Sequence, residues 1–563
     1  MGGQTRTVTR RPAARASPPP SASASDSESA SPARPAKRRK TASSTGSKID
    51  AYRKILHQST AELKPSLPPT RCHTLAYHKP LLLDGGRGAD SRAAFLSWFD
   101  SVSATRAMPW RKPWVNPADF SSDDDAALRR TLEKRAYEVW ISEIMLQQTR
   151  VAVVIEYWKR WMERWPTIQD LAAASADDVL AAWRGLGYYS RATRIHEAAK
   201  LAVGDSSMRG LLPSSAKDLA DKIPGVGRYT AGAISCIAFG RPAPMVDGNV
   251  LRVLSRQLGL YGNIKTDKAV IDMIWVAAEE LVNAVALDGQ DDKTVTPDDT
   301  RSDGPGRWGQ ALMELGSTVC APRPNCGECP ITATCRAYSE GLALSNKSKN
   351  TEDIITDMED MCGVCEPFDE TDDIENQPPA AAKKGGKQAT LSAFFTKSAP
   401  TKPPAKVAKV DVEAIVNHAR KFPVKVAKKA VREEETLVCA VVRGDGKYLI
   451  HKRPAKGLLA GLWEFPSSML ERDVPASQRK KLAKEFIAGV LNEEGVEYVG
   501  ELGSVPWLFS HIKLTMHVHL FRLEGTKDVG VGGTMSGRWS EEVDTESMGT
   551  GMRKCWDLVK EAA

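Results

Sequence analysis

The sequence predicts a multidomain chain, with an all-α domain followed by a smaller α+β domain. Three observations predict it. Apolar residues recur at intervals of three and four from Tyr137 to Trp165, which is typical of helices. Further along, two β-rich runs flank Gly444-Asp445-Gly446, a hairpin signal. Residues 341–432 are poor in aromatics and rich in Lys, Ala, Pro and acids, which is typical of a connector between folded parts.

The 563 residues are enough for two or three domains with their own cores. We expect a disordered basic tail and lead-in at 1–87, because residues 1–48 nearly lack large apolar side chains. The helical domain is predicted at 88–340, with an acidic insertion at 286–306, and the α+β domain at 433–563. The net charge of +8 is too small to indicate a nucleic-acid partner by itself.

The basic run at 34–40 (RPAKRRK) indicates a nuclear localisation signal, with a solvated basic tail as the alternative. Residues 1–25 contain several Arg and no acid, which also fits a mitochondrial presequence. The prolines at 18–20 would break its helix, so the nucleus is the first expectation. No apolar run approaches the roughly 20 residues that span a bilayer. We therefore expect no membrane association, and a monomer.

The helical domain has periodic patterns that predict further helices at 176–183, 191–203, 229–239 and 249–258. Pro166 is expected to end the first long stretch. Between two of these helices, Ile223–Gly232 reads IPGVGRYTAG. Gly225 and Gly227 free backbone N–H groups at a helix start, where the helix dipole also favours a phosphate oxygen. The whole ten-residue string indicates a DNA-binding hairpin, whereas Gly-x-Gly alone would be weak evidence for one.

An acidic residue follows this hairpin in Met245–Val250 (MVDGNV). Asp247 lies one helix and a turn after the hairpin, so we expect it in the same cleft, although it could also cap a helix. A carboxylate there would stabilise the positive charge that develops on a sugar when its glycosidic bond breaks. A second, buried carboxylate should protonate the leaving base. Glu143 is the best candidate, with a paired helix carboxylate as the alternative.

Four cysteines, Cys320, Cys326, Cys329 and Cys335, lie within sixteen residues. Their spacing predicts a metal site, and fits either zinc or an iron–sulfur cluster.

At this point the chain from about 95 to 340 resembles the iron–sulfur helix–hairpin–helix DNA glycosylases, and among them the adenine glycosylase (MutY) family. The residues that carry the resemblance are the hairpin, the four cysteines and the runs at 139–149 (VWISEIMLQQT), 185–192 (GLGYYSRA), 245–250 and 310–316 (QALMELG). The resemblance implies a [4Fe–4S] cluster. The family usually has six residues between the first two cysteines, whereas five separate Cys320 from Cys326, so the first loop should follow a tighter path.

The resemblance also implies roles for individual residues. Glu143 would be the acid, Asp247 would stabilise or trap the sugar cation, and Tyr229 and Asn249 would assist. The positions that match the adenine pocket are Trp110, Arg111 and Gln310, and those that match residues wedging into the duplex are Gln147, Leu186 and Tyr188. Related lyases carry a Lys after the hairpin, where this chain has Tyr229. A phenol cannot form the imine that leads to strand cleavage, so we expect base removal alone.

The last domain resembles the Nudix-like domain of the same family in two runs, 457–466 and 505–519. Its Phe509, Ser510 and His511 are implied to read 8-oxoguanine. The predicted helix near 481–496 offers Glu485, Glu493 and Glu494, and this spacing does not build the magnesium motif of a Nudix hydrolase. We therefore expect recognition without nucleotide hydrolysis. His517 and His519 alternate with His511 on a strand, where half-exposed residues are expected rather than a metal site.

The connector carries two further features. Gln388, Leu391, Phe394 and Phe395 match the box that binds the sliding clamp PCNA. Cys362 and Cys365 resemble part of a zinc site in the eukaryotic connector. That site wants at least three ligands and no third cysteine is adjacent, so a pair of free thiols is the alternative.

Taken together, these features predict a monofunctional glycosylase that acts on double-stranded DNA with adenine opposite 8-oxoguanine or guanine. Three alternatives remain: a lyase acting on oxidised pyrimidines, a Nudix phosphohydrolase with a DNA-binding appendage, and an inactive adaptor bound to the clamp.

Overall fold

The computed structural model describes residues 42–58, 63–346, 361–368, 412–426 and 431–562, apart from 69, 291, 293, 455, 456, 458, 472, 492–495, 510 and 526–536. The basic run at 34–40 and the clamp box at 388–395 therefore lie outside the described residues. Within the described part, no helix combines the length and the apolar character needed to cross a membrane.

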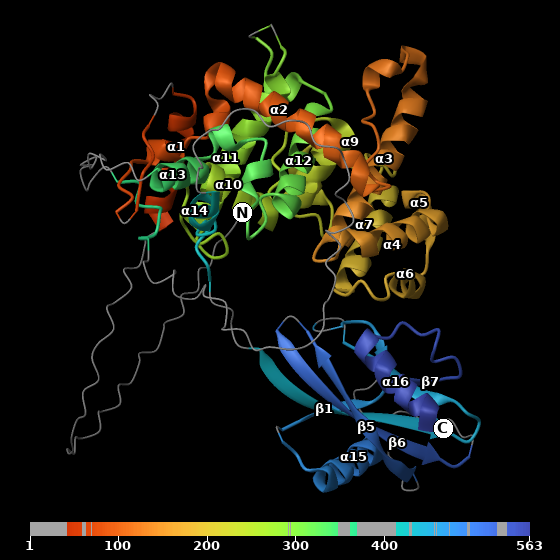
Figure 1. Cartoon of the computed structure of the whole chain (residues 1–563). Helices are drawn as coiled ribbons and strands as arrows, with labels where there is room; N and C mark the ends of the chain where they lie inside the picture. The colour runs from red at the N-terminus through yellow and green to blue at the C-terminus, as the bar shows by residue number, and fades with distance from the viewer. Residues whose placement is uncertain are drawn as a thin grey trace, which may run out of the picture. The chain divides into compact units, whose positions relative to one another are not determined.

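The helical domain contains the helices α1 to α13, and α14 packs against it (Figure 1). Their bounds are α1 Ala42–Leu56, α2 Gly85–Ser103, α3 Asp125–Leu146, α4 Val151–Arg164, α5 Ile168–Ala173, α6 Ala176–Ala182, α7 Ser190–Gly204, α8 Ala216–Lys222, α9 Arg228–Phe239, α10 Gly248–Gln257, α11 Lys268–Leu287, α12 Gly304–Thr318, α13 Arg336–Ser345 and α14 Val412–Ala419.

The four shorter helices predicted from periodicity agree with α6, α7, α9 and α10 to within one residue at each end. Polar residues start several of these helices: Ser175 caps α6 and Asp247 caps α10 through side-chain oxygens that accept backbone N–H groups. Helix α9 is buried from Thr230 to Phe239. A Cβ at Gly232 would lie 2.3 Å from the Pro244 carbonyl oxygen, so only glycine permits this close approach.

The long apolar stretch from Tyr137 to Trp165 forms two helices. It divides into α3, which ends at Leu146, and α4, which begins at Val151. Gln148 adopts a left-handed conformation with φ of 57° at the break. The periodicity continues on both sides of the break, so it gives no signal of the interruption.

The lead-in before residue 88 is folded from Ala42 onward, which corrects the disorder predicted for 42–48 and the lead-in. Tyr52 of α1 is fully buried and its hydroxyl donates to the His78 carbonyl oxygen at 2.7 Å. Tyr77 and Leu82 are also buried. These apolar contacts with the helical core explain the order of this segment, because they offset the entropy lost when the chain is fixed.

The connector predicted at 341–432 is not wholly a linker. Helix α14 packs against α13, and His418 of α14 lies 2.7 Å from the Glu340 carboxylate at Nε2. Glu340 is fully buried and also accepts from Arg71 and from the Tyr77 hydroxyl. A buried carboxylate needs such partners. The network therefore attaches α14 and the lead-in to the same face of the helical domain.

The C-terminal domain is a seven-stranded mixed sheet between two helices (Figure 1). The order is β3-β2-β1-β6-β5, β4 pairs with β1 and β7 with β2, and β1 and β6 are parallel. One face packs against α15 and the other against α16. The bounds are β1 Arg432–Arg443, β2 Tyr448–Lys452, β3 Trp463–Glu464, β4 Ser467–Leu470, α15 Ala476–Leu491, β5 Val496–Leu508, β6 Ile512–Leu523, β7 Gly537–Ser540 and α16 Thr550–Ala562.

The predicted hairpin around Gly444-Asp445-Gly446 is confirmed, because β1 and β2 are antiparallel with Val442 opposite Tyr448. The prediction of half-exposed histidines on β6 is wrong. His519 is fully buried and His517 nearly so, and they lie beside Tyr498 and Glu435, respectively. The sheet carries a helix on each face, so neither face of β6 is left to solvent.

Candidate active site and metal centres

The DNA-binding hairpin predicted at 223–232 lies between α8 and α9. Gly225 has φ of 80°, a conformation that favours glycine, and Gly227 is the N-cap of α9. A Cβ at Gly227 would meet nothing within 4 Å, and Gly227 and Arg228 are both exposed, so this end of α9 is accessible. The end of a twelve-residue helix with accessible N–H groups can bind a phosphate oxygen.

Glu143 lies on the buried C-terminal half of α3 and is 5% exposed. Burial raises the pKa of its carboxyl to about 7, and the charge of Asp247 raises it further, whereas the hydrogen bond from Tyr229 lowers it. A carboxyl with this pKa is partly protonated at neutral pH, which a general acid requires.

Tyr229 is the second residue of α9 and faces Glu143. Its hydroxyl donates to Glu143 Oε2 at 2.6 Å and lies 2.8 Å from the Met313 sulfur. Burial and the neighbouring carboxylates raise the pKa of Tyr229, so the phenol keeps its proton and remains a donor. The position holds no amine, so no imine can form there.

Asp247 both caps α10 and faces the site, so both interpretations of this residue apply. Its carboxylate accepts from the Asn249 amide at 2.9 Å, the Val250 amide at 2.8 Å and the Asn249 side chain at 2.9 Å. The Asp247 carboxylate lies near Glu143, and its charge contributes to raising the pKa of the Glu143 carboxyl.

Asn249 links this carboxylate to the cysteine loop. Its side-chain oxygen accepts from Arg252 Nη2 at 2.9 Å, and Arg252 also donates to the carbonyl oxygens of Gly316 and Cys320. Sequence patterns did not single out Arg252. Asn249 is thus held beside Asp247 by its own two hydrogen bonds to the carboxylate and by the one from Arg252.

A single cavity of about 980 Å³ brings most predicted residues together. Its lining includes all four catalytic candidates, the three pocket candidates and one wedge candidate: Glu143, Asp247, Tyr229, Asn249, Trp110, Arg111, Gln310 and Gln147. Leu186, Tyr188, Gly225 and Gly227 do not line it. Its volume is ample for a flipped-out nucleotide, because small-molecule sites typically measure about 300–1,000 Å³.

The wall of this cavity contains a carboxylate that sequence reasoning missed. Glu314 of α12 is 3% exposed and accepts from Arg111 at 2.7 Å and Arg106 at 2.8 Å. The hydrogen bond to Glu314 holds the Arg111 guanidinium at the cavity wall, and Arg106 binds the other oxygen of the same carboxylate. Gln310, on the same helix, donates to the Gly306 carbonyl oxygen. The sequence offered no signal for Glu314 beyond its place in the run 310–316.

The predicted wedge residues lie on two loops. Gln147 follows α3, whereas Leu186 and Tyr188 lie between α6 and α7. Leu186 is buried at 6% exposure, and Tyr188 is 50% exposed. Arg191 donates to carbonyl oxygens of both loops, so the loops are neighbours.

In the C-terminal domain, Phe509 and His511 lie at the turn between β5 and β6. The Phe509 amide donates to the Ile512 carbonyl oxygen at 2.7 Å, which closes the turn, and His511 is exposed. Ser510 lies outside the described residues. Neighbouring Leu508 is 70% exposed, so this turn presents apolar and polar side chains to solvent.

The four clustered cysteines line one cavity together with Arg256. All four are free thiols, and Arg256 donates to the Cys320 sulfur at 3.2 Å. Burial raises the pKa of Cys326 to about 11 and of Cys329 to about 12. Among the described residues, a different group has its ligand atoms within 4.8 Å of one another.

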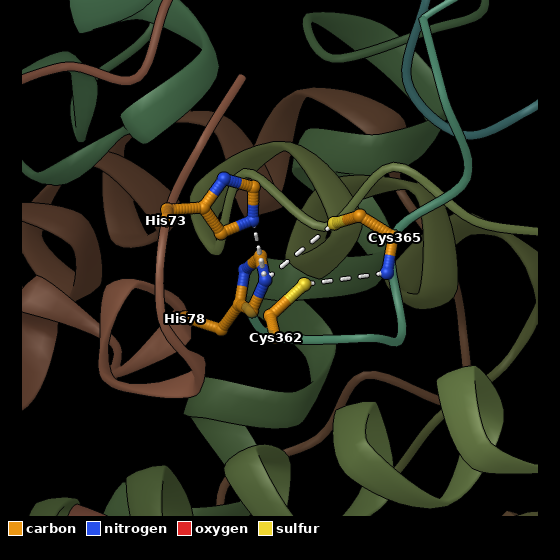
Figure 2. Close-up of side chains that lie close together, drawn as sticks. All are labelled: His73, His78, Cys362 and Cys365. Atoms are coloured by element: carbon orange, nitrogen blue, oxygen red, sulfur yellow. Dashed lines mark hydrogen bonds between the residues drawn. The ribbon is translucent and has the colours of Figure 1, made fainter. Parts of the chain in front are cut away.

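That different group consists of His73, His78, Cys362 and Cys365. Figure 2 shows the two imidazoles and two sulfurs turned toward one another, from the lead-in and the connector. The two Nε2 atoms lie 3.1 Å apart, and His78 Nε2 is 3.5 Å from the Cys365 sulfur. These separations are close to the ligand–ligand distances of a tetrahedral zinc site, about 3.3–3.8 Å for zinc–nitrogen and zinc–sulfur bonds of ordinary length.

Each histidine of this group is oriented by a partner on its other nitrogen. His73 Nδ1 lies 3.2 Å from the Ser66 hydroxyl, and His78 Nδ1 lies 3.0 Å from the Leu258 carbonyl oxygen. Such contacts are typical of histidines that bind a metal through Nε2. The sequence predicted only the cysteines. The signal that could have found the histidines is their spacing of five, but they lie almost 300 residues before Cys362.

The helical fold, the hairpin and the paired carboxyls define a class of DNA-repair protein. The family model described as HhH-GPD superfamily base excision DNA repair protein matches residues 141–279, and the NUDIX domain model matches residues 437–558. The chain also resembles a thermostable thymine-DNA glycosylase at 24% identity, covering 44% of this chain and 95% of that one with a TM-score of 0.33. A TM-score this low supports no inference about this chain.

Relatives that match over most of the chain identify the family within this class. The adenine DNA glycosylase of Homo sapiens is 36% identical over 503 residues, which cover 86% of this chain and 76% of the relative. That of Rattus norvegicus is 35% identical over 484 residues, covering 84% and 78%. The chain therefore belongs to the adenine DNA glycosylase family.

Proposed function

We propose that this chain is a monofunctional DNA glycosylase that hydrolyses the N-glycosidic bond of adenine mispaired with 8-oxoguanine or guanine. The observation that carries the proposal is the single cavity in which Glu143, Asp247 and Tyr229 meet beside a phosphate-binding hairpin. Membership of the adenine DNA glycosylase family supports adenine as the base.

The two carboxyls divide the chemistry. Protonated Glu143 delivers its proton to the departing adenine, so the base leaves neutral. The Asp247 carboxylate stabilises the positive charge that develops on the sugar. Water then adds to the sugar carbon and returns a proton to Glu143. Tyr229 orients Glu143 through its 2.6 Å hydrogen bond and provides no amine for strand cleavage.

A single-turnover assay on duplexes with adenine opposite 8-oxoguanine or guanine tests which base is removed and which opposite base is preferred. We expect strand breaks at the adenine only after alkali treatment; breaks without alkali would support a lyase. Phe509→Ala and His511→Ala should lose the preference for 8-oxoguanine. Leu508→Ala removes an exposed neighbouring side chain and should keep the preference. Unchanged preference in the first two variants would contradict the role of the C-terminal domain.

We also propose that the four clustered cysteines hold an iron–sulfur cluster and that the second group holds zinc. The cysteine-only donor set, gathered in one cavity with Arg256, supports the cluster, while close nitrogen and sulfur atoms in the second group support zinc. The cluster would supply a cross-link between α12 and α13. The residues that would bind zinc, His73, His78, Cys362 and Cys365, would join the lead-in to the connector.

Metal analysis of purified protein tests both sites. We expect the protein to contain iron, to absorb at about 400 nm, and to contain one zinc ion per chain. Cys362→Ser should lose zinc and keep iron. Cys72→Ser is the matched control, because Cys72 adjoins His73 but lies outside the group. Zinc that persists in Cys362→Ser would contradict the second site.

Two further expectations remain proposals. Binding to PCNA depends on residues 388–395 and nuclear localisation on residues 34–40, and both segments lie outside the described residues. Competition by a peptide of residues 386–397 for PCNA would test the first, and the distribution of a fusion with and without residues 34–40 would test the second.

A further inference from the structure

Two loops that carry predicted wedge residues adopt backbone conformations that are unusual for their residues. Gln148, in the loop between α3 and α4, has φ of 57°, and Tyr188, in the loop between α6 and α7, has φ of 48°. A residue with a Cβ is disfavoured in this left-handed region by about 1–2 kcal/mol. Surrounding contacts must therefore hold both loops in place.

Arg191, in the first turn of α7, supplies such contacts to both loops. Its Nη1 donates to the carbonyl oxygens of Ile144 at 2.8 Å and Gln147 at 2.7 Å. Its Nη2 donates to those of Leu186 and Gly187, each at 3.1 Å. Among the hydrogen bonds of the described residues, no other side chain reaches carbonyl oxygens of both loops. The Arg191 guanidinium thus satisfies carbonyl oxygens at the C-terminal end of α3 and connects this end to the loop between α6 and α7.

Aromatic rings enclose the same guanidinium. Its central carbon lies 5.3 Å from the Trp183 ring and 5.4 Å from the Tyr188 ring. Burial lowers the pKa of Arg191 to about 10, so the group stays charged at neutral pH. Trp183 is fully buried, whereas Tyr188 is 50% exposed. Arg191 therefore supports the inner side of an aromatic ring whose outer side faces solvent.

Two further contacts of the second loop are made by residues near it rather than by the loop after α3. The Trp183 indole donates to the Gly187 carbonyl oxygen at 3.0 Å, and the Tyr157 hydroxyl donates to that of Arg184 at 2.5 Å. Neither contact reaches the loop after α3. The relative position of Gln147 and Tyr188 thus depends on Arg191.

We infer that Arg191 is a positioning residue that joins the loops 147–150 and 184–188 into one preformed wedge for opening the duplex at the base to be removed. This inference rests on the proposed function. Extruding a base from a duplex requires a few kcal/mol of unstacking and unpairing. A wedge that is already ordered loses less conformational entropy on binding than two independent loops.

Arginine is required by geometry rather than by charge alone. The four carbonyl oxygens approach from two directions, and the planar guanidinium offers donors on two nitrogens to meet them. A lysine ammonium is a single point with three donors on a flexible stem, so it cannot bridge both loops at once. Arg191→Lys therefore keeps the charge and removes the bridge.

The test compares Arg191→Lys with Arg194→Lys. Arg194 is exposed on the same helix, and the same substitution there leaves both loops untouched. Single-turnover excision is measured on a duplex with adenine opposite 8-oxoguanine. Base opening is measured by the fluorescence of 2-aminopurine in place of that adenine. Binding is also measured on a duplex with a tetrahydrofuran abasic analogue, where no base needs to be extruded.

For Arg191→Lys we expect at least about tenfold slower excision and a weaker fluorescence rise, the scale expected when one or two hydrogen bonds are lost. Affinity for the abasic duplex should stay within about threefold of wild type, a threshold set well below that tenfold step. Excision and fluorescence equal to those of Arg194→Lys would overturn the inference, and so would a loss of affinity for the abasic duplex as large as the loss of excision rate. Failure of wild type to excise adenine would instead contradict the proposed function.

Discussion

Because Glu143 is buried, its replacement by glutamine should stabilise the folded protein, although it removes the acid that we propose protonates the departing base. Burial raises the pKa of the carboxyl from 4.5 to about 7 in the folded protein. The folded state thus holds the proton more tightly than the unfolded chain. Ionisation of Glu143 destabilises the fold: the effect is absent below about pH 4.5, grows as the pH rises and is complete above about pH 7.

The magnitude follows from the same two values. A carboxyl whose pKa rises from 4.5 to about 7 on folding is destabilising by about 3 kcal/mol when fully ionised. At pH 5 the corresponding figure is below about 1 kcal/mol, because the folded form is protonated. Glutamine has nearly the same shape and carries no charge at any pH. Glu143→Gln should therefore raise the free energy of unfolding strongly at pH 8 and weakly at pH 5.

The assay is chemical denaturation followed by tryptophan fluorescence at both pH values. Glu163→Gln is the matched control, because Glu163 is exposed on α4 and loses the same charge. The control should change neither midpoint appreciably. An equal effect of Glu143→Gln at pH 5 and pH 8 would refute the reasoning, since only the ionised form is penalised by burial. In the wild type, the same pKa should make excision decline above about pH 7, where Glu143 loses its proton.

Other consequences concern the partners of Glu143. Asp247→Asn should lose excision by several orders of magnitude, since the sugar cation loses its counter-charge, and keep DNA binding and thermal stability, since asparagine also caps α10; near wild-type single-turnover rates would contradict the role of Asp247. Tyr229→Phe should shift the alkaline limb of the excision–pH profile upward, since the Tyr229 hydrogen bond lowers the pKa of Glu143; a downward shift would exclude this effect.

Local sequence signals were sufficient for the parts of the site that are themselves local. The glycine pair at Gly225 and Gly227 and the acid at Asp247 lie in short runs whose backbone geometry follows from residue type. The burial of Glu143 followed from the apolar helix around it. These features depend on neighbours within a few residues, which periodicity and capping rules describe well.

Features created by distant contacts were not predictable in this way. His73 and Cys362 meet only because the lead-in and the connector dock on the same helices. Three residues of α14, Ile415, His418 and Ala419, are buried, and His418 contacts Glu340; nothing in the sequence of the helix identifies that partner. The break at Gln148 also escaped notice, since the carbonyl oxygens it exposes are satisfied by Arg191, more than forty residues later.

The docked helix α14 also determines the length of the tether to the second domain. Phe422 is buried and the Val424 amide donates to the Gly262 carbonyl oxygen at 3.2 Å, so the chain is anchored there, and β1 starts at Arg432. The chain between Val424 and Arg432 can span at most about 30 Å. A connector that was unanchored over the whole of 341–432 would instead have a root-mean-square span of about 50 Å. A short tether keeps the effective concentration of the second domain high. Insertions within 369–411 would leave that concentration unchanged, and insertions after Val424 would lower it.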